Sequence, residues 1–176
     1  MKTKMINSSA TKRIIFVLCT VFFAVFQNTF LPALGINIPV FFLIPLCVAI
    51  SMSEYEFSGM LFGLLAGALW DLSSPLSDGI ITLFFTVFAM LAGLFTHYIL
   101  RNTIIAAFVL TGSGAIIYSF INFIFNCLSR DISPVNFRSA VFYLCGILLT
   151  TVLTPIFYYP VRALSAKFNS INDRSV

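Results

Sequence analysis

The chain has 176 residues, of which 60% are hydrophobic and only 9% are charged, with a mean hydropathy of +1.03. This composition excludes a soluble globular protein, because too little polar surface remains to cover a fold exposed to water. The net charge of +4 comes without a basic stripe of interleaved aromatic residues, so we expect no nucleic-acid partner. The sequence therefore predicts an integral membrane protein whose main solvent is lipid.

Six apolar blocks follow one another along the chain and predict an all-α membrane protein with six transmembrane helices. The hydrocarbon core is about 30 Å thick and takes roughly 20 helical residues to cross, so the second and third blocks are short. These two could cross a thinned bilayer, or one could be re-entrant. Pro39 and Pro45 make the second block the one that we expect to be broken. The blocks cover residues 14–30, 36–52, 57–72, 79–100, 104–128 and 140–160.

The distribution of Lys and Arg predicts the topology. Six spans place both termini on one side, which collects eight basic residues, whereas Arg130 and Arg138 lie on the other side. This bias favours cytoplasmic termini. We expect one polytopic domain over residues 1–176, a retained first span, and short, loosely ordered tails at 1–12 and 167–176. The eight basic residues are Lys2, Lys4, Lys12, Arg13, Arg101, Arg162, Lys167 and Arg174.

Aromatic and basic residues gather at the predicted cytoplasmic ends of the spans. Tyr98 is followed by Arg101 at the end of the fourth block. Tyr158 and Tyr159 are followed by Arg162 at the end of the sixth. Because Tyr and Arg are typical of the headgroup level of a bilayer, we expect these five residues to act as interfacial anchors.

The third block carries a stripe of small residues. Gly59, Gly63 and Gly67 recur every four residues, and Asp71 is the next step, so all four share one face of a helix. Such a face lets another helix approach closely in lipid. The neighbour could belong to the same chain or to a partner. If a partner docks there, Gly63→Leu should abolish its capture and leave the protein folded.

A polar turn follows this stripe near the predicted outer end. Asp71 is expected to organise the turn by accepting backbone N–H bonds, or alternatively to contact a partner or a polar ligand. Asp78 or Ser77 could cap the next helix, where the helix dipole favours a carboxylate. The expected turn and cap residues are Ser73, Ser74, Pro75, Asp78 and Gly79.

The chain shows no constellation typical of catalysis or metal binding. His97 is the only histidine, and no nucleophile elbow or phosphate-binding loop occurs. Glu54 and Glu56 lie in a short loop that we expect to be solvated, without a partner to tune them. We therefore expect no enzyme, no cofactor and no metal. The cysteines form no C-x-x-C pair and stand at Cys19, Cys47, Cys127 and Cys145.

The segment GLLAGALWDL at residues 63–72 leads into a Ser/Pro turn, Gly79 and an apolar span that ends at Tyr98 and Arg101. In this order of features the chain resembles the bacterial rod shape-determining protein family MreD, over about residues 57–102. The resemblance implies a small polytopic protein similar in architecture to the S subunits of energy-coupling-factor transporters.

The resemblance also implies a function. It predicts a non-enzymatic scaffold of the cell-wall elongation complex in the bacterial plasma membrane, which helps control cell shape and lateral peptidoglycan synthesis. The implied partners are an MreC-like bitopic protein, a SEDS glycosyltransferase and a class B penicillin-binding protein. The alternative is a small-molecule-binding S subunit of an energy-coupling-factor vitamin transporter, with an outer-end pocket near Asp71, Asp78 and Arg138.

Overall fold

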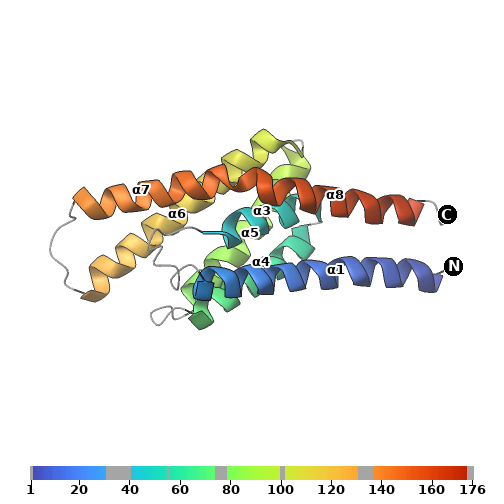
Figure 1. Ribbon diagram of the computed structural model, residues 1–176, viewed down its shortest axis with the longest axis horizontal. Helices are drawn as coiled ribbons and strands as arrows, with labels where there is room; N and C mark the ends of the chain where they lie inside the picture. Colours follow the sequence, from blue (N-terminus) through green and yellow to red (C-terminus); the bar gives the residue numbers. More distant parts are fainter. Residues whose placement is uncertain are drawn as a thin grey trace.

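The computed structural model describes residues 2–30, 41–54, 56–73, 79–99, 102–130 and 137–173, which form helices and no strand. Because η1 extends α1, and α8 follows α7 end to end, these elements form six helical segments, which are called passes below and correspond in order to the six apolar blocks (Figure 1). In chain order they are α1 (Lys2–Val25), the π-helix η1 (Phe26–Phe30), α3 (Leu43–Ser53), α4 (Glu56–Ser73), α5 (Ile80–Tyr98), α6 (Ile104–Arg130), α7 (Phe137–Val152) and α8 (Thr154–Asp173).

Four helical stretches are long and apolar enough to cross a membrane, which supports a multi-pass membrane protein. The expectation of six full spans is therefore met only in part. Helix α3 has 11 residues, and at 1.5 Å per residue it reaches about 16 Å, half of the hydrocarbon core. The four long stretches are Ala10–Thr29, Ile80–Tyr98, Ile104–Ile124 and Tyr143–Phe168.

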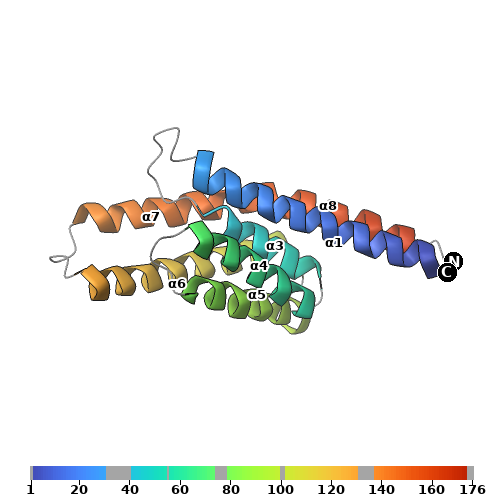
Figure 2. The same cartoon turned by 90° about the horizontal axis from the view of Figure 1, so that it is seen from below.

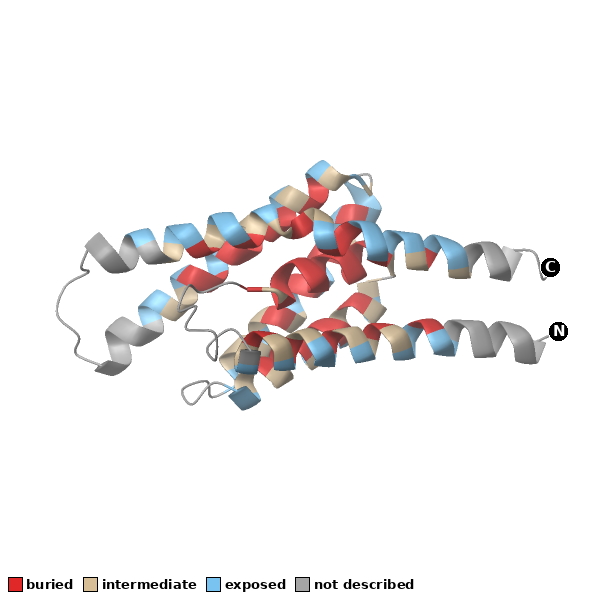
Figure 3. Cartoon of the chain, in the orientation of Figure 1, coloured by how far each residue is buried: buried red, intermediate tan, exposed pale blue. Residues whose placement is uncertain are grey.

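Helix α3 lies at the centre of the bundle, and ten of its residues, from Leu43 to Met52, are buried (Figure 3). A helix that is apolar on all sides has to be enclosed by other elements, and here the other passes surround it. Pro45 does not break this helix, because it stands in the first turn, where its missing N–H is not needed. Pro39 lies outside the described residues.

Aromatic side chains join the start of α3 to the passes around it. The ring centroid of Phe41 lies 5.6 Å from that of Trp70 on α4 and 4.7 Å from that of Tyr118 on α6. Trp70 and Tyr118 are themselves 5.1 Å apart. Tilted and edge-on arrangements at these distances are the favoured geometries of aromatic pairs, so this end of the core is packed with rings.

The beginning of α1 and the end of α8 lie at the same end of the molecule (Figures 1 and 2), as an even number of passes requires. Helix extends into both predicted tails, since α1 begins at Lys2 and α8 ends at Asp173, while their loose order stays a prediction. The physical reason is cooperativity. A helix already formed in the membrane extends into polar flanking residues at little cost, because nucleation is complete.

Candidate functional site

The glycine stripe of α4 lies against helix α5 of the same chain. A Cβ added to Gly63 would lie 2.5 Å from the carbonyl oxygen of Phe85, and one added to Gly67 would lie 2.5 Å from the Cα of Thr82. Both obstacles are backbone atoms, which no side-chain rotation can remove. Glycine is therefore what allows α4 and α5 to approach so closely.

The remaining glycine of the stripe faces α3. A Cβ on Gly59 would lie 3.0 Å from the hydroxyl oxygen of Ser51. The sequence left open whether the stripe packs against the same chain or against a partner, and the described residues show packing within the chain. The expected behaviour of Gly63→Leu needs correction, because a bulky side chain there would separate α4 from α5 and disturb the fold itself.

Asp71 ties the end of α4 to the start of α5. Its Oδ2 accepts the Thr82 N–H at 2.9 Å and also accepts the Thr82 hydroxyl proton. Thr82 lies in the first turn of α5, where backbone N–H groups have no partner within the helix and the helix dipole favours negative charge. Asp71 therefore accepts a backbone N–H as expected, but the amide belongs to the next helix, which Asp71 caps from across the turn.

The other turn residues take different roles. Gly79 precedes α5 with φ +81°, a left-handed conformation that costs residues with a Cβ about 1–2 kcal/mol. The Ser73 hydroxyl donates to the Leu69 carbonyl at 3.1 Å, within its own helix and not in the turn. Ser74, Pro75 and Asp78, which the sequence places in the turn and at the helix cap, lie outside the described residues.

Side chains from distant passes satisfy the start of the buried helix α3. The N–H groups of Phe42 and Leu43 donate to Gln27 Oε1 at 2.7 and 3.4 Å, and the Phe41 N–H donates to Thr150 Oγ1 at 3.1 Å. Gln27 is buried in η1. Because Phe41 and Leu43 are buried, unsatisfied amides at this helix start would be costly. These side chains are what permit a half-length helix inside the bundle.

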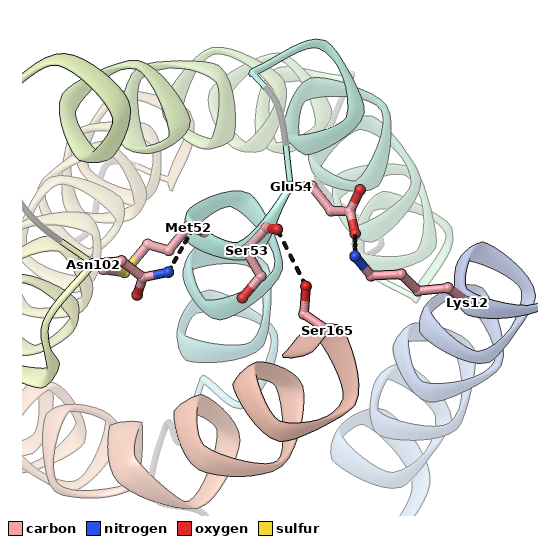
Figure 4. Close-up of polar contacts among 6 residues, drawn as sticks. All are labelled: Lys12, Met52, Ser53, Glu54, Asn102 and Ser165. Carbon is pink, nitrogen blue, oxygen red and sulfur yellow. Dashed lines mark hydrogen bonds and ion pairs between the residues drawn. The ribbon is translucent and has the colours of Figure 1, made fainter. Parts of the chain in front are cut away.

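The other end of α3 has a matching set of partners (Figure 4). The Asn102 amide group donates to the Met52 carbonyl at 3.0 Å, and the Ser165 hydroxyl donates to the Ser53 carbonyl at 3.4 Å. These partners come from the segment before α6 and from α8, so three separate parts of the chain meet at this end. We call Lys12, Ser53, Glu54, Asn102 and Ser165 the α3 collar.

The collar contains a buried ion pair. Lys12 Nζ lies 2.5 Å from Glu54 Oε1, and each side chain is only 10% exposed (Figure 4). The expectation of a solvated loop is therefore wrong for Glu54, because α1 brings a lysine from far along the chain to its carboxylate. A charge that leaves water has to be paired, and this pair meets that need. Glu56 is half-buried in the first turn of α4, where the helix dipole favours a carboxylate.

The expected interfacial anchors fall into two groups. Tyr98 and Tyr159 are 72% and 60% exposed, as a headgroup position requires. Tyr158 is only 1% exposed, so that prediction is wrong. Its hydroxyl donates to Asn102, 3.0 Å from Oδ1, because this face of α8 packs against the core. Arg162 is exposed and donates to the Tyr158 hydroxyl at 2.8 Å, whereas Arg101 lies outside the described residues.

The sequence reasoning missed Gln27, Thr150, Asn102 and the pairing of Lys12. The one feature of the sequence that could have indicated these contacts is that each of the four is a polar residue within or beside an apolar block. Within the described part of the chain, no group of three His, Cys, Asp or Glu residues could hold a metal ion. Of the three residues expected near an outer-end pocket, Asp71 is engaged with Thr82, and Asp78 and the Arg138 side chain are not described.

Comparisons of the chain with protein families, with curated proteins and with solved structures find no match. The residues themselves define the class, which is an all-helical, multi-pass membrane protein. Its distinguishing feature is a short second helix that the other passes enclose and whose two ends are satisfied by their side chains.

Proposed function

We propose that this chain is a non-enzymatic, MreD-like scaffold of the bacterial cell-wall elongation complex, in the plasma membrane with both termini in the cytoplasm. The hairpin of α4 and α5 carries the proposal. The residues by which the chain resembles MreD are the residues that shape this hairpin, since Gly63 and Gly67 set its close approach and Asp71 caps α5. The resemblance over residues 57–102 therefore rests on residues that have a structural role in this chain.

The surface of the bundle suits a protein that binds other transmembrane helices. Helices α6 and α7 extend past the ends of α4 and α5 (Figures 1 and 2), so α4 and α5 do not cover the parts of α6 and α7 that reach beyond them. We call the exposed apolar residues of the outer half of α6 the α6 face. It consists of Ile116, Ile117, Phe120, Phe123 and Ile124.

A bitopic partner can pack its single span on the α6 face. The implied MreC-like protein offers one transmembrane helix, and the contact would rest on close side-chain packing, because burial from lipid gives little driving force. A SEDS glycosyltransferase and a class B penicillin-binding protein complete the proposed assembly. The scaffold would hold these proteins together and thereby help set where lateral peptidoglycan is made.

The first test is native mass spectrometry of the tagged full-length protein, extracted from its own membrane in mild detergent. We expect a complex with a bitopic protein. A lone 19.5 kDa species that carries a stoichiometric small molecule would overturn the scaffold proposal in favour of a vitamin-transporter S subunit.

Photo-crosslinking locates the docking surface. A crosslinking amino acid replaces Phe120 on the α6 face, or Leu83 on α5 as a matched control, since the two positions are 63% and 67% exposed. We expect the bitopic partner to crosslink to position 120 and not to position 83. Crosslinking at position 83 alone would move the docking surface to α5 and leave the scaffold proposal standing.

A further inference from the structure

The exposed side chains of helix α8 become more polar along the helix. Ile156 and Tyr159 are exposed, three residues apart, and Arg162 follows after three more and is also exposed. Ile156 and Tyr159, and likewise Tyr159 and Arg162, are neighbours on the helix surface, so the three follow a slanting line in which Arg162 lies about 120° around the axis from Ile156. The surface therefore runs from an aliphatic residue through a phenol to a guanidinium as it approaches the end of the molecule where the termini lie.

The guanidinium of Arg162 is held in place by a partly buried chain of hydrogen bonds. Arg162 Nη1 donates to the Tyr158 hydroxyl at 2.8 Å, and its Cζ lies 5.6 Å from the centre of the Tyr158 ring. Tyr158 in turn donates to Asn102, whose amide donates to the Met52 carbonyl at the end of α3. A guanidinium positioned in advance loses less conformational entropy when it binds a further acceptor.

We propose that Arg162 and Tyr159 form a binding site for the phosphate of an anionic phospholipid, in the leaflet on the side of the termini. Arg has five N–H donors in a planar fork that matches a phosphate, and a tyrosine hydroxyl adds one more donor. The exposed Ile156 beside them would contact the acyl chains.

The order of groups favours a lipid over an acidic protein segment. An anionic lipid presents its phosphate at the headgroup level and its hydrocarbon next to it, in the same sequence as Arg162, Tyr159 and Ile156. Lys167, five residues further along α8, is also exposed and adds positive charge beyond Arg162. The nearby carboxylate of Glu54 is already paired with Lys12.

The test measures lipid retention by the full-length protein. Purified protein is exchanged into detergent that contains equal amounts of phosphatidylglycerol and phosphatidylcholine of the same chain length, and bound lipids are counted by native mass spectrometry. Wild type should retain phosphatidylglycerol several-fold over phosphatidylcholine. Arg162→Gln should lose this preference. Tyr158→Phe should weaken it, because it keeps the charge of Arg162 but removes the hydroxyl to which Arg162 donates.

Arg13→Gln is the matched control, since Arg13 is an exposed arginine at the same end of the bundle. It should keep the preference. If Arg13→Gln and Arg162→Gln lose the preference for phosphatidylglycerol equally, the attraction is diffuse and the proposed site is wrong. The site is also wrong if Arg162→Gln keeps the full preference. Two competitors test the source of the anion. Displacement of the lipid by soluble polyglutamate, or by millimolar inorganic phosphate, would reassign the site to an acidic protein or to free phosphate. The outcome does not depend on the proposed scaffold function.

Discussion

Replacing Gly63 by alanine is the most direct test of how helices α4 and α5 pack against each other. The added Cβ would lie 2.5 Å from the Phe85 carbonyl oxygen and 2.6 Å from the Ala89 Cβ, where real Cβ atoms essentially never come within 3.0 Å. The first obstacle is backbone, so α4 and α5 have to move apart. Overpacking of this kind costs about 1–3 kcal/mol, while alanine in place of glycine returns up to about 1 kcal/mol of helix propensity. We expect a net destabilisation of about 1–2 kcal/mol.

Gly112→Ala is the matched control. A Cβ on Gly112, in helix α6, would lie 3.8 Å from the Thr151 hydroxyl oxygen, which is an ordinary van der Waals contact. Only the gain in helix propensity remains, so this variant should be unchanged or more stable by up to about 1 kcal/mol. The same chemical change is therefore expected to have opposite signs at the two positions.

The assay is thermal unfolding in detergent micelles, followed by the fluorescence of Trp70. This residue is the only tryptophan, and its ring centroid lies 5.5 Å from that of Phe85 on α5, so its emission reports on the α4–α5 contact. At about 2–4 °C per kcal/mol, Gly63→Ala should melt roughly 2–8 °C below wild type. A melting temperature at or above that of wild type would refute the reasoning, and so would an equal loss in Gly112→Ala.

Three further predictions concern polar contacts. Lys12→Met should destabilise the protein by about 3–5 kcal/mol because it leaves the Glu54 carboxylate buried without its cation, and adding Glu54→Leu should recover most of the loss in the same melt. Gln27→Leu should cost about 1–3 kcal/mol and speed hydrogen exchange at the start of α3, where two backbone amides lose their acceptor. Asp71→Leu should cost about 1–2 kcal/mol and speed exchange of the Thr82 amide, whereas Asp71→Asn keeps an acceptor and should do less.

Ser73→Ala is the shared control for these variants, because Ser73 is exposed and its hydroxyl donates to the Leu69 carbonyl of its own helix. It should change stability by less than about 0.5 kcal/mol. An effect of Lys12→Met or Gln27→Leu as small as that of Ser73→Ala would contradict the contacts assigned to them. Equal exchange of the Thr82 amide in wild type and Asp71→Leu would contradict the cap.

Local sequence patterns predicted the helices well where the main contacts join residues that are close in the sequence. The third block, placed at residues 57–72, is α4 at Glu56–Ser73, and the fourth, placed at 79–100, is α5 at Ile80–Tyr98. The four-residue spacing of the glycines predicted a close helix contact, which is found. Both signals depend only on residues within a few helical turns, so both can be read from the sequence.

The candidate site was harder to predict because its partners come from distant parts of the chain. Glu54 looked solvated because its cation, Lys12, belongs to the first pass. Tyr158 looked like an interfacial anchor, although its neighbour Tyr159 takes that exposed position. One residue along a helix turns a side chain by about 100°, and only the arrangement of the other helices decides which of two adjacent tyrosines meets the core.

The sequence by itself determined that this protein is helical and lies in a membrane, since a chain with 9% charged residues has too few polar groups for water and must satisfy its backbone internally. Only the tertiary structure decided that α3 is enclosed, and that Gln27 and Asn102 satisfy its two ends. The physical reason is that composition and periodicity act locally, whereas a buried polar group finds its partner through the packing of helices far apart in the chain.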